Sequence, residues 1–383
     1  MSSGRKSSPW RPNPRHKKIL LFIALLAAGV GFFWFFGAFD FYETRPRSDI
    51  GKLDIVALAK DKATIAPVIE KFGIQKVMSA LVEKSGGGSV FDCHQEAHNI
   101  GRVGYEFEKE QAFASCDASC HSGCYHGAME TFLGETGTAN LAANIDRVCS
   151  TFSTSFGNFE CLHGVGHGVL AYVDYDLPEA IKECWKLGSS FAQRSCIGGM
   201  FMENILTGQG LGATADVHET EWVNRTDPHY PCNKIDQTYE VQFECYQMQT
   251  SWMLYINGYD FNKVAALCAK APLNMIPVCY KSFGRDAAGH TLRNPVKILD
   301  LCDKVPRAHY DQCIVGALNV IVDFWGPGLK NQAAEFCELT PTHGKNTCYS
   351  TLAWRLTDVF ADPAMQKLRC DEFEEAYRHL CKS

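Results

Sequence analysis

Two kinds of apolar run alternate along much of the chain. Short amphipathic runs end in a cysteine, as in FNKVAALC, VKILDLC and NQAAEFC. Longer and more apolar runs begin with a cysteine, as in CIVGALNVIVDFWG and CYSTLAWRLTDVF. Both kinds space their apolar residues so that an α-helix would bury one face. We therefore predict a repeating pair of helices, a short helix A followed by a longer and more buried helix B.

Prolines indicate where three of the short helices end. Pro272, Pro306 and Pro341 each lie four residues after the cysteine of a helix A. Proline lacks the N–H that would continue a helix, and it disfavours helical backbone in the residue before it. Helix A should therefore end near its cysteine, after which the chain turns back into helix B.

The cysteines repeat together with the helices. Fourteen of the eighteen form seven local pairs, at 149/161, 184/196, 232/245, 268/279, 302/313, 337/348 and 370/381. The first members follow one another at 33 to 36 residues, except for one step of 48 that contains the Gly- and Pro-containing segment 208–231. A period of about 34 residues is typical of two-helix repeats. We predict an all-α solenoid of about eight two-helix repeats, in which a disulfide joins the end of each helix A to the start of helix B.

Four cysteines, Cys93, Cys116, Cys120 and Cys124, lie outside these pairs. They allow three pairings. The last three are four residues apart, so one helix could align them, and Cys93 would then reach across to one of the three. We favour two disulfides here. The alternative is that one of these thiolates binds a metal.

The N-terminal part of the chain predicts a membrane anchor. Residues 1–18 carry six basic and no acidic residues, and residues 19–39 are 21 residues without a charge. As a helix, that run spans roughly 31 Å, enough to cross a bilayer. We predict a single-pass type II membrane protein, with a cytoplasmic tail at 1–18, a transmembrane signal anchor at 19–39, a linker and helical cap at 40–92, and a repeat domain at 93–383 that is periplasmic, extracellular or lumenal.

Composition agrees with this placement. Eighteen cysteines suit an oxidising compartment, where disulfides persist. A net charge of -6 argues against nucleic acid as a partner. The membrane is the partner that the sequence predicts, and a protein or peptide is the candidate substrate.

Three successive B helices begin with a histidine that is followed four residues later by a second potential metal ligand. The pairs are His94/His98, His126/Glu130 and His163/His167. Residues four apart share one helix face, and packed helices lie roughly 8–10 Å apart, so the three pairs could meet around one or two ions. We predict a site in residues 93–205 for a divalent transition metal, namely copper, iron or zinc.

Two features of these helices leave alternatives open. The pair His94/His98 is displaced by one residue relative to its cysteine, so four ligands on two helices would remain if it faced away. Glycines at 127, 164, 166 and 168 fit either room for a cofactor or a close approach of two helices. Without a metal, the histidines would be hydrogen-bonded core residues.

Six potential ligands exceed the needs of one structural zinc, which favours an enzyme with a mono- or dinuclear centre. Copper or iron would suit oxidation with dioxygen and zinc would suit hydrolysis; we favour the oxidoreductase. Glu96 and Glu203 are the candidate catalytic carboxylates. The segment HQEAH resembles the zincin motif HExxH, but Glu96 comes one residue later, about 100° further round the helix, which argues against a metalloprotease. The alternative function is a non-catalytic repeat scaffold that binds proteins at the membrane surface.

Overall fold

The computed structural model describes residues 49–85, 90–117, 119–120, 122–210, 220–323 and 332–381. Every regular element in these residues is a helix. The tail and the anchor that the sequence predicts, at 1–18 and 19–39, lie outside them. No described helix is both long and apolar enough to cross a bilayer. The chain divides into Met1–Leu53 and Asp54–Ser383, and the following description concerns the second unit.

Long helices occur where the sequence predicts each helix B. They are α5 (Val90–Glu108), α7 (Gly123–Thr136), α9 (Ser155–Tyr172), α11 (Ser190–Gly208), α12 (Tyr239–Ile256), α14 (Ile276–His290), α16 (Tyr310–Asp323) and α18 (Thr342–Val359). The shorter helices are α2 (Ile55–Leu58), α3 (Lys62–Phe72), α4 (Ile74–Lys84), α6 (Gln111–Ser115), α8 (Leu141–Cys149), α10 (Leu177–Cys184), α13 (Phe261–Cys268), α15 (Pro295–Cys302), α17 (Gln332–Leu339) and α19 (Pro363–Cys370). Two 3-10 helices, η2 (Arg307–His309) and η3 (Glu375–Leu380), complete the unit.

Local sequence sets both ends of most A helices. Asp176, Asp260, Asn294 and Asp362 cap α10, α13, α15 and α19 by accepting a backbone N–H from the first turn. Such caps satisfy donors that the helix itself leaves unpaired. The same four helices end at the cysteine that forms the disulfide to the next element, as the sequence predicts.

Nine disulfides hold the unit together, and the seven predicted local pairs are confirmed. The other two join Cys93 to Cys120 and Cys116 to Cys124. The idea that one helix aligns the last three of these cysteines is wrong. Helix α6 ends at Ser115 and α7 begins at Gly123, and Cys120 between them has a φ of +52°, which no helix accommodates.

The predicted helical cap consists of α2, α3 and α4, of which α3 and α4 pack against α5. The chain breaks between α3 and α4 at Gly73, whose φ of +76° favours glycine. The cap thereby covers the outer side of α5 and leaves its other side to α7.

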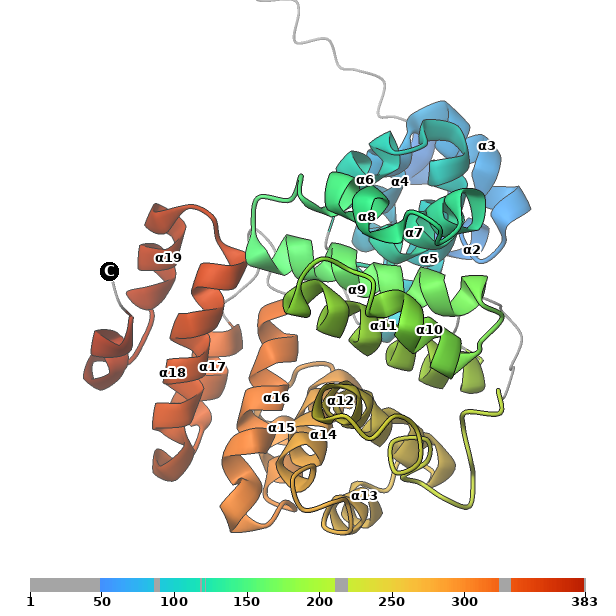
Figure 1. Cartoon of the computed structure of the whole chain (residues 1–383). Helices are drawn as coiled ribbons and strands as arrows, with labels where there is room; N and C mark the ends of the chain where they lie inside the picture. Colours follow the sequence, from blue (N-terminus) through green and yellow to red (C-terminus); the bar gives the residue numbers. More distant parts are fainter. Residues whose placement is uncertain are drawn as a thin grey trace, which may run out of the picture. The chain divides into compact units, whose positions relative to one another are not determined.

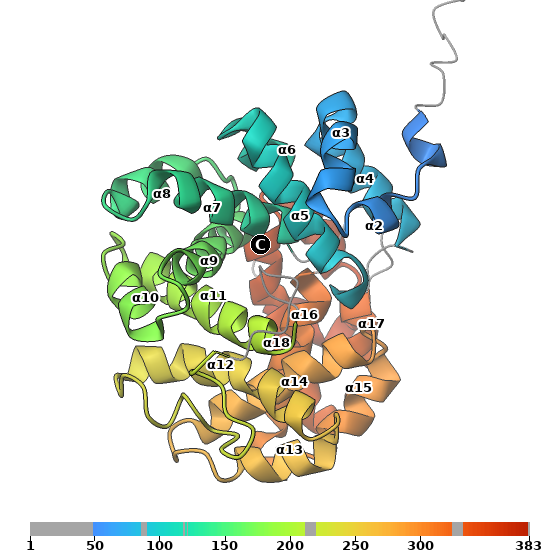
Figure 2. The ribbon, with the colours of Figure 1, turned by 90° about the vertical axis from the view of Figure 1, so that its right-hand side faces the viewer.

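The long helices pack in chain order, from α5 against α7 to α16 against α18. Helix α18 also returns to α9, where the Arg355 guanidinium lies 5.5 Å from the centre of the Phe156 ring. Figure 1 shows the red end of the chain reaching the green helix α9, and Figure 2 shows the helices in the perpendicular view. An open solenoid has contacts between neighbours alone. Here α9, α11, α12, α14, α16 and α18 close into a cycle, which we call the six-helix ring.

Candidate metal centre

Glycines bring α5 and α7 unusually close together. A Cβ atom added to Gly127 would lie 2.0 Å from the backbone oxygen of His98, and one added to Gly101 would lie 2.1 Å from that of Cys124. Helices α9 and α11 meet in the same way, through Gly166 and Gly199. These contacts decide the open question about the glycines in favour of close helix approach. They also place the histidines of neighbouring helices side by side.

Five of the six predicted ligands form one buried group, which we call the histidine cluster. Its members are His94, His98, His126, His163 and His167. The ring of His126 lies at the centre, with ring centroids 4.5 Å from His167, 5.3 Å from His98, 5.6 Å from His94 and 5.7 Å from His163. The pair on α5 therefore faces the other two helices despite its displacement by one residue.

Oxygen acceptors beside Nδ1 favour one tautomer for each of the two histidines on α5. The Nδ1–H of His94 donates to the carbonyl oxygen of Cys120 at 2.8 Å. His98 Nδ1 lies 2.9 Å from Glu130 Oε1. Burial opposes ionisation of Glu130, but the charge of Arg102 and the hydrogen bonds from His98 and Arg102 outweigh it and lower the pKa of Glu130, so its carboxylate accepts. When each ring is neutral and donates from Nδ1 to these oxygens, its Nε2 carries a lone pair.

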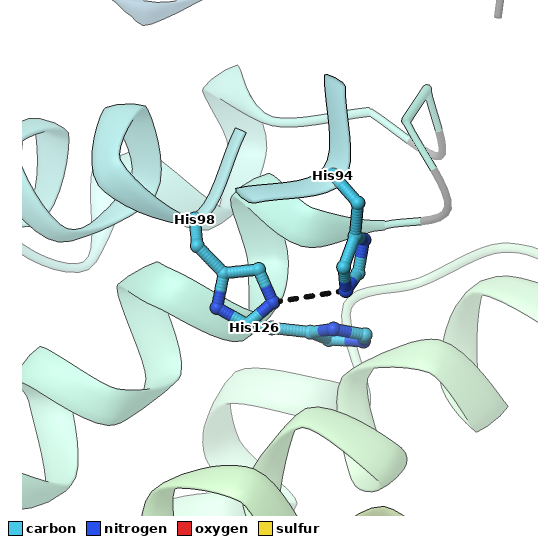
Figure 3. Close-up of side chains that lie close together, drawn as sticks. All are labelled: His94, His98 and His126. Carbon is cyan, nitrogen blue, oxygen red and sulfur yellow. Dashed lines mark hydrogen bonds between the residues drawn. The ribbon is translucent and has the colours of Figure 1, made fainter. Parts of the chain in front are cut away.

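The two Nε2 atoms then face one another across 3.1 Å. Figure 3 shows this arrangement, with the ring of His126 beside the two nitrogens. Two lone pairs at this distance repel unless a cation, either a proton or a metal ion, lies between them. Nitrogens bound at about 2.0–2.1 Å to a tetrahedral ion lie roughly 3.3–3.4 Å apart, close to the separation observed. One ligand atom each of His94, His98 and His126 lies within 4.8 Å of the others.

His126 is the group whose surroundings most need a ligand. It is fully buried, and neither of its ring nitrogens has a hydrogen-bond partner among the described residues. Burial and the four surrounding imidazoles lower its pKa well below the usual value, so the ring is neutral. A buried donor or acceptor without a partner costs about 1–3 kcal/mol. A metal ion would satisfy one nitrogen and leave the other to carry the proton.

A glutamate from the next helix lies beside three of these histidines. Glu130 on α7 accepts from His98, and Glu203 on α11 lies 2.9 Å from His167 Nδ1. Glu160 on α9 lies 3.8 Å from His126 Nε2, and its Oε2 atom has no hydrogen-bond partner among the described residues. Metal-binding histidines almost always have such an acceptor for their second nitrogen.

Sequence reasoning missed Glu160, which directly precedes Cys161. A signal was available, because Glu160, His163 and His167 stand at i, i+3 and i+7 on one face of α9. Burial, reinforced by the negative charge of Asp323, raises the pKa of Glu160 to about 8. Glu160 therefore interacts electrostatically with Asp323 on α16 while it lies beside His126 of the histidine cluster.

The remaining predicted residues occupy different places. Both oxygens of Glu130 are engaged, Oε1 with His98 and Oε2 with Arg102 at 2.5 Å, although Glu130, His98 and His167 also have ligand atoms within 4.8 Å of one another. His163 lies at the edge of the cluster, with Nε2 3.3 Å from the sulfur of Met202. Glu96 is buried on α5 and belongs to neither group of three potential ligands found in the described residues.

Glu203 lies completely inside the protein. Besides His167, it accepts from the hydroxyls of Tyr175 at 3.1 Å and Thr207 at 2.9 Å. These contacts fix its carboxylate beside the cluster.

The chain matches no protein-family model, no curated protein and no solved structure. The candidate site therefore rests on its own geometry.

Proposed function

We propose that the protein is a metalloenzyme in which His94, His98 and His126 hold a divalent transition-metal ion. The observation that carries this proposal is the pair of Nε2 atoms 3.1 Å apart, beside a buried imidazole with two unpartnered nitrogens. An ordinary core histidine has hydrogen bonds for its polar atoms. Three protein ligands leave a tetrahedral ion one position for a substrate or water, as catalytic sites do.

The neighbouring carboxylates orient the rings. Glu130 and Glu203 hold the Nδ1–H groups of His98 and His167, which keeps the Nε2 atoms turned toward the cluster. On this proposal Glu203 is a positioning residue for His167, and the catalytic role expected for Glu96 has no support from its position. His167 and Glu130 could hold a second ion with His98, which keeps the dinuclear form of the proposal open.

Oxidation is the favoured reaction class. Copper or iron would supply one-electron chemistry with dioxygen, and zinc would supply Lewis-acid activation of water for hydrolysis. The thioether of Met202 beside His163 favours copper, because soft sulfur ligands select Cu(I). The chain itself contributes buried, neutral imidazole nitrogens, and the carboxylates of Glu130 and Glu203 orient the rings of His98 and His167.

The architecture fits an exoplasmic repeat protein. We interpret the A and B helices as copies of one disulfide-joined unit, a solenoid whose later units curve back to α9. Nine disulfides suit an oxidising compartment, and the apolar run at 19–39 would anchor the domain to the outer face of a membrane.

Elemental analysis of the purified full-length protein tests the proposal. We expect about one ion per chain in the wild type and in His290→Ala, which removes an exposed histidine outside the cluster, and loss of the ion in His98→Ala. Dioxygen uptake with ascorbate as reductant should follow the metal content if the ion is copper or iron. A metal-free wild type that takes up none of the three metals on reconstitution would contradict the proposal.

A further inference from the structure

A cavity of about 460 Å³, which we call the port cavity, lies beside the C-terminal halves of α5 and α7. Part of its lining is the buried ion pair of Arg102 and Glu130, whose side chains are each 7% exposed. The other charged side chains of the lining are exposed; they are Lys62, Glu106, Lys109 and Glu135. The port cavity therefore extends from solvent to a buried ion pair.

The buried end of the port cavity touches the histidine cluster. Glu130 Oε1 lies 2.9 Å from His98 Nδ1, and Arg102 Nη2 lies 3.3 Å from the same nitrogen. Each oxygen of a carboxylate has two lone pairs. The contacts with His98 and Arg102 use one lone pair on each oxygen of Glu130. The second lone pair of each oxygen remains for a cation while both partners stay in place.

Two groups of three potential ligands share His98. The inner group consists of His94, His98 and His126, the ligands of the proposed centre. The second group, which we call the entry group, consists of Glu130, His98 and His167. In each group, one ligand atom per residue lies within 4.8 Å of the others. An ion that passes from the entry group to the inner group would therefore keep one ligand residue throughout.

His167 in the entry group has a nitrogen without a partner. Its ring is completely buried, and its Nδ1 lies 2.9 Å from Glu203 Oε2. Its Nε2 has no hydrogen-bond partner among the described residues. When Nδ1–H donates to Glu203, Nε2 carries a lone pair, and a buried acceptor left without a partner is unfavourable. An ion at the entry group would satisfy this nitrogen.

A buried metal site needs a route by which the ion reaches it. His98 and His126 are 0% exposed, so solvent does not reach their rings directly. The port cavity is large enough for a hydrated ion, since six waters at roughly 30 Å³ each take up about 180 Å³. Three positive and three negative side chains line it, so their formal charges cancel and form no positive barrier to a divalent cation.

We propose that the metal ion enters and leaves through the port cavity and binds the entry group on its way to the inner group. The inference rests on the proposed metal centre, because it concerns how that centre is loaded. Carboxylate oxygen and imidazole nitrogen bind zinc at similar distances, about 2.0–2.2 Å and 2.0–2.1 Å, so the ion can exchange one for the other. Glu130 and His167 thereby act in loading as well as in the resting protein.

The rates of zinc and copper(II) binding, with each metal supplied alone to the metal-free full-length protein, test the route. Gly134→Trp and Glu106→Trp add an indole ring at the port cavity, one from α7 and one from α5; at Gly134 an added Cβ meets nothing within 4 Å. We expect both variants to slow uptake, and release to a chelator, by about tenfold or more. Affinity should stay the same, because a blocked path slows both directions alike.

Two controls match these variants. Gly134→Ala adds only a methyl group at the same position, and Phe107→Trp adds an indole ring at an exposed residue that does not line the port cavity. Both should keep the wild-type rates.

His167→Leu tests the entry group. A ligand that only holds the resting ion affects mainly release, whereas a ligand of the entry group affects uptake. We therefore expect His167→Leu to slow uptake by about tenfold or more. His290→Leu, at an exposed histidine outside the cluster, should take up metal at the wild-type rate.

Metal content, measured on the same samples, separates the two proposals. A wild type that takes up no metal contradicts the metal centre and the route with it. A metal-containing protein whose rates are unchanged in both tryptophan variants overturns the route and leaves the metal centre intact. Wild-type uptake in His167→Leu overturns the entry group alone.

Discussion

The histidine cluster and a polar network between α12 and α14 occupy corresponding places in two halves of the chain. In the second place, Thr250 donates to Asp286 at 2.6 Å, and Arg285 binds Asp286 and the hydroxyl of Ser251, both at 2.7 Å. Ser251 and Arg285 are the sixth residues after their cysteines, as is His167 after Cys161. The α12–α14 network satisfies its polar groups from within, whereas His126 in the cluster has no such partner.

The glycine contacts, by contrast, are the same in both halves. Gly284 and Gly316 bring α14 and α16 together as Gly101 and Gly127 do for α5 and α7, with an added Cβ 2.0 Å and 1.8 Å from a backbone oxygen of the partner helix. Among the described residues, no group of potential metal ligands accompanies them there. Glycine at these positions is therefore a feature of helix packing, and the unsatisfied nitrogens are the feature that indicates a ligand.

The largest expected difference between the histidine cluster and the α12–α14 network comes from removing the central imidazole, that of His126. His126→Leu should weaken metal binding more than about 100-fold, since one of three ligands is lost. In the metal-free protein it should raise the free energy of unfolding by about 1–3 kcal/mol, because an unsatisfied buried group is replaced by an apolar one. Thr250→Val in the α12–α14 network should lower it by a similar amount. Chemical denaturation of both variants measures the signs, and a loss of stability in His126→Leu would show that His126 is a satisfied core residue.

Removing a carboxylate from the cluster should have the next largest effect. Glu203→Gln retains an acceptor for His167 but loses the charge, and we expect metal affinity to fall about 10–100-fold. Asp286→Asn makes the same change in the α12–α14 network and should leave metal affinity unchanged. Competition with a chelator measures both. Equal affinities for Glu203→Gln and the wild type would remove Glu203 from the site.

Glycine substitutions should affect both halves equally in stability and unequally in metal binding. Gly127→Ala and Gly284→Ala each force a methyl group against a backbone oxygen, which should cost about 1–3 kcal/mol. Gly134→Ala on α7 meets nothing within 4 Å and should stabilise the helix by up to about 1 kcal/mol. Of the three, Gly127→Ala alone should also weaken metal binding. Undiminished metal binding in a destabilised Gly127→Ala would contradict the link between helix approach and site.

A further prediction concerns the pH dependence of the metal-free protein. The pKa of Glu160 is raised to about 8 in the folded state, above its usual value near 4.5. Between about pH 4.5 and 8 the unfolded chain loses this proton and the folded chain keeps it, so stability falls as pH rises, by at most about 1.4 kcal/mol per unit. Denaturation at several pH values should show this slope, and Glu160→Gln should remove that part of it. An unchanged slope would show that Glu160 is already ionised.

The local features of the fold follow from the sequence because they depend on residues close together in the chain. The spacing of cysteines such as Cys268 and Cys279 predicts their disulfide and the helices that it joins. Closure of the ring depends on small rotations between successive helices, which no local pattern records. The pairing of Cys93 with Cys120 depends on a turn with left-handed backbone at Cys120. The four-residue spacing of Cys116, Cys120 and Cys124 instead suggests that one helix aligns all three.

The sequence predicts which residues form the candidate site, but it does not predict which residue hydrogen-bonds which. The i, i+4 pairs on three helices brought the histidines together, because equivalent helix faces meet in a repeat. The pair His126/Glu130 does not act as one unit: Glu130 hydrogen-bonds His98 on the preceding helix. That exchange of partners across helices depends on how α5 and α7 cross, which the sequence of either helix alone does not specify.

Anomalous X-ray diffraction from crystals of the protein with its metal tests the central claim most directly. The account predicts an anomalous peak within about 2.0–2.1 Å of the Nε2 atoms of His94 and His98 and of one ring nitrogen of His126. A protein reconstituted with copper, iron or zinc that shows no peak among these three rings, with His126 hydrogen-bonded to water instead, would contradict it.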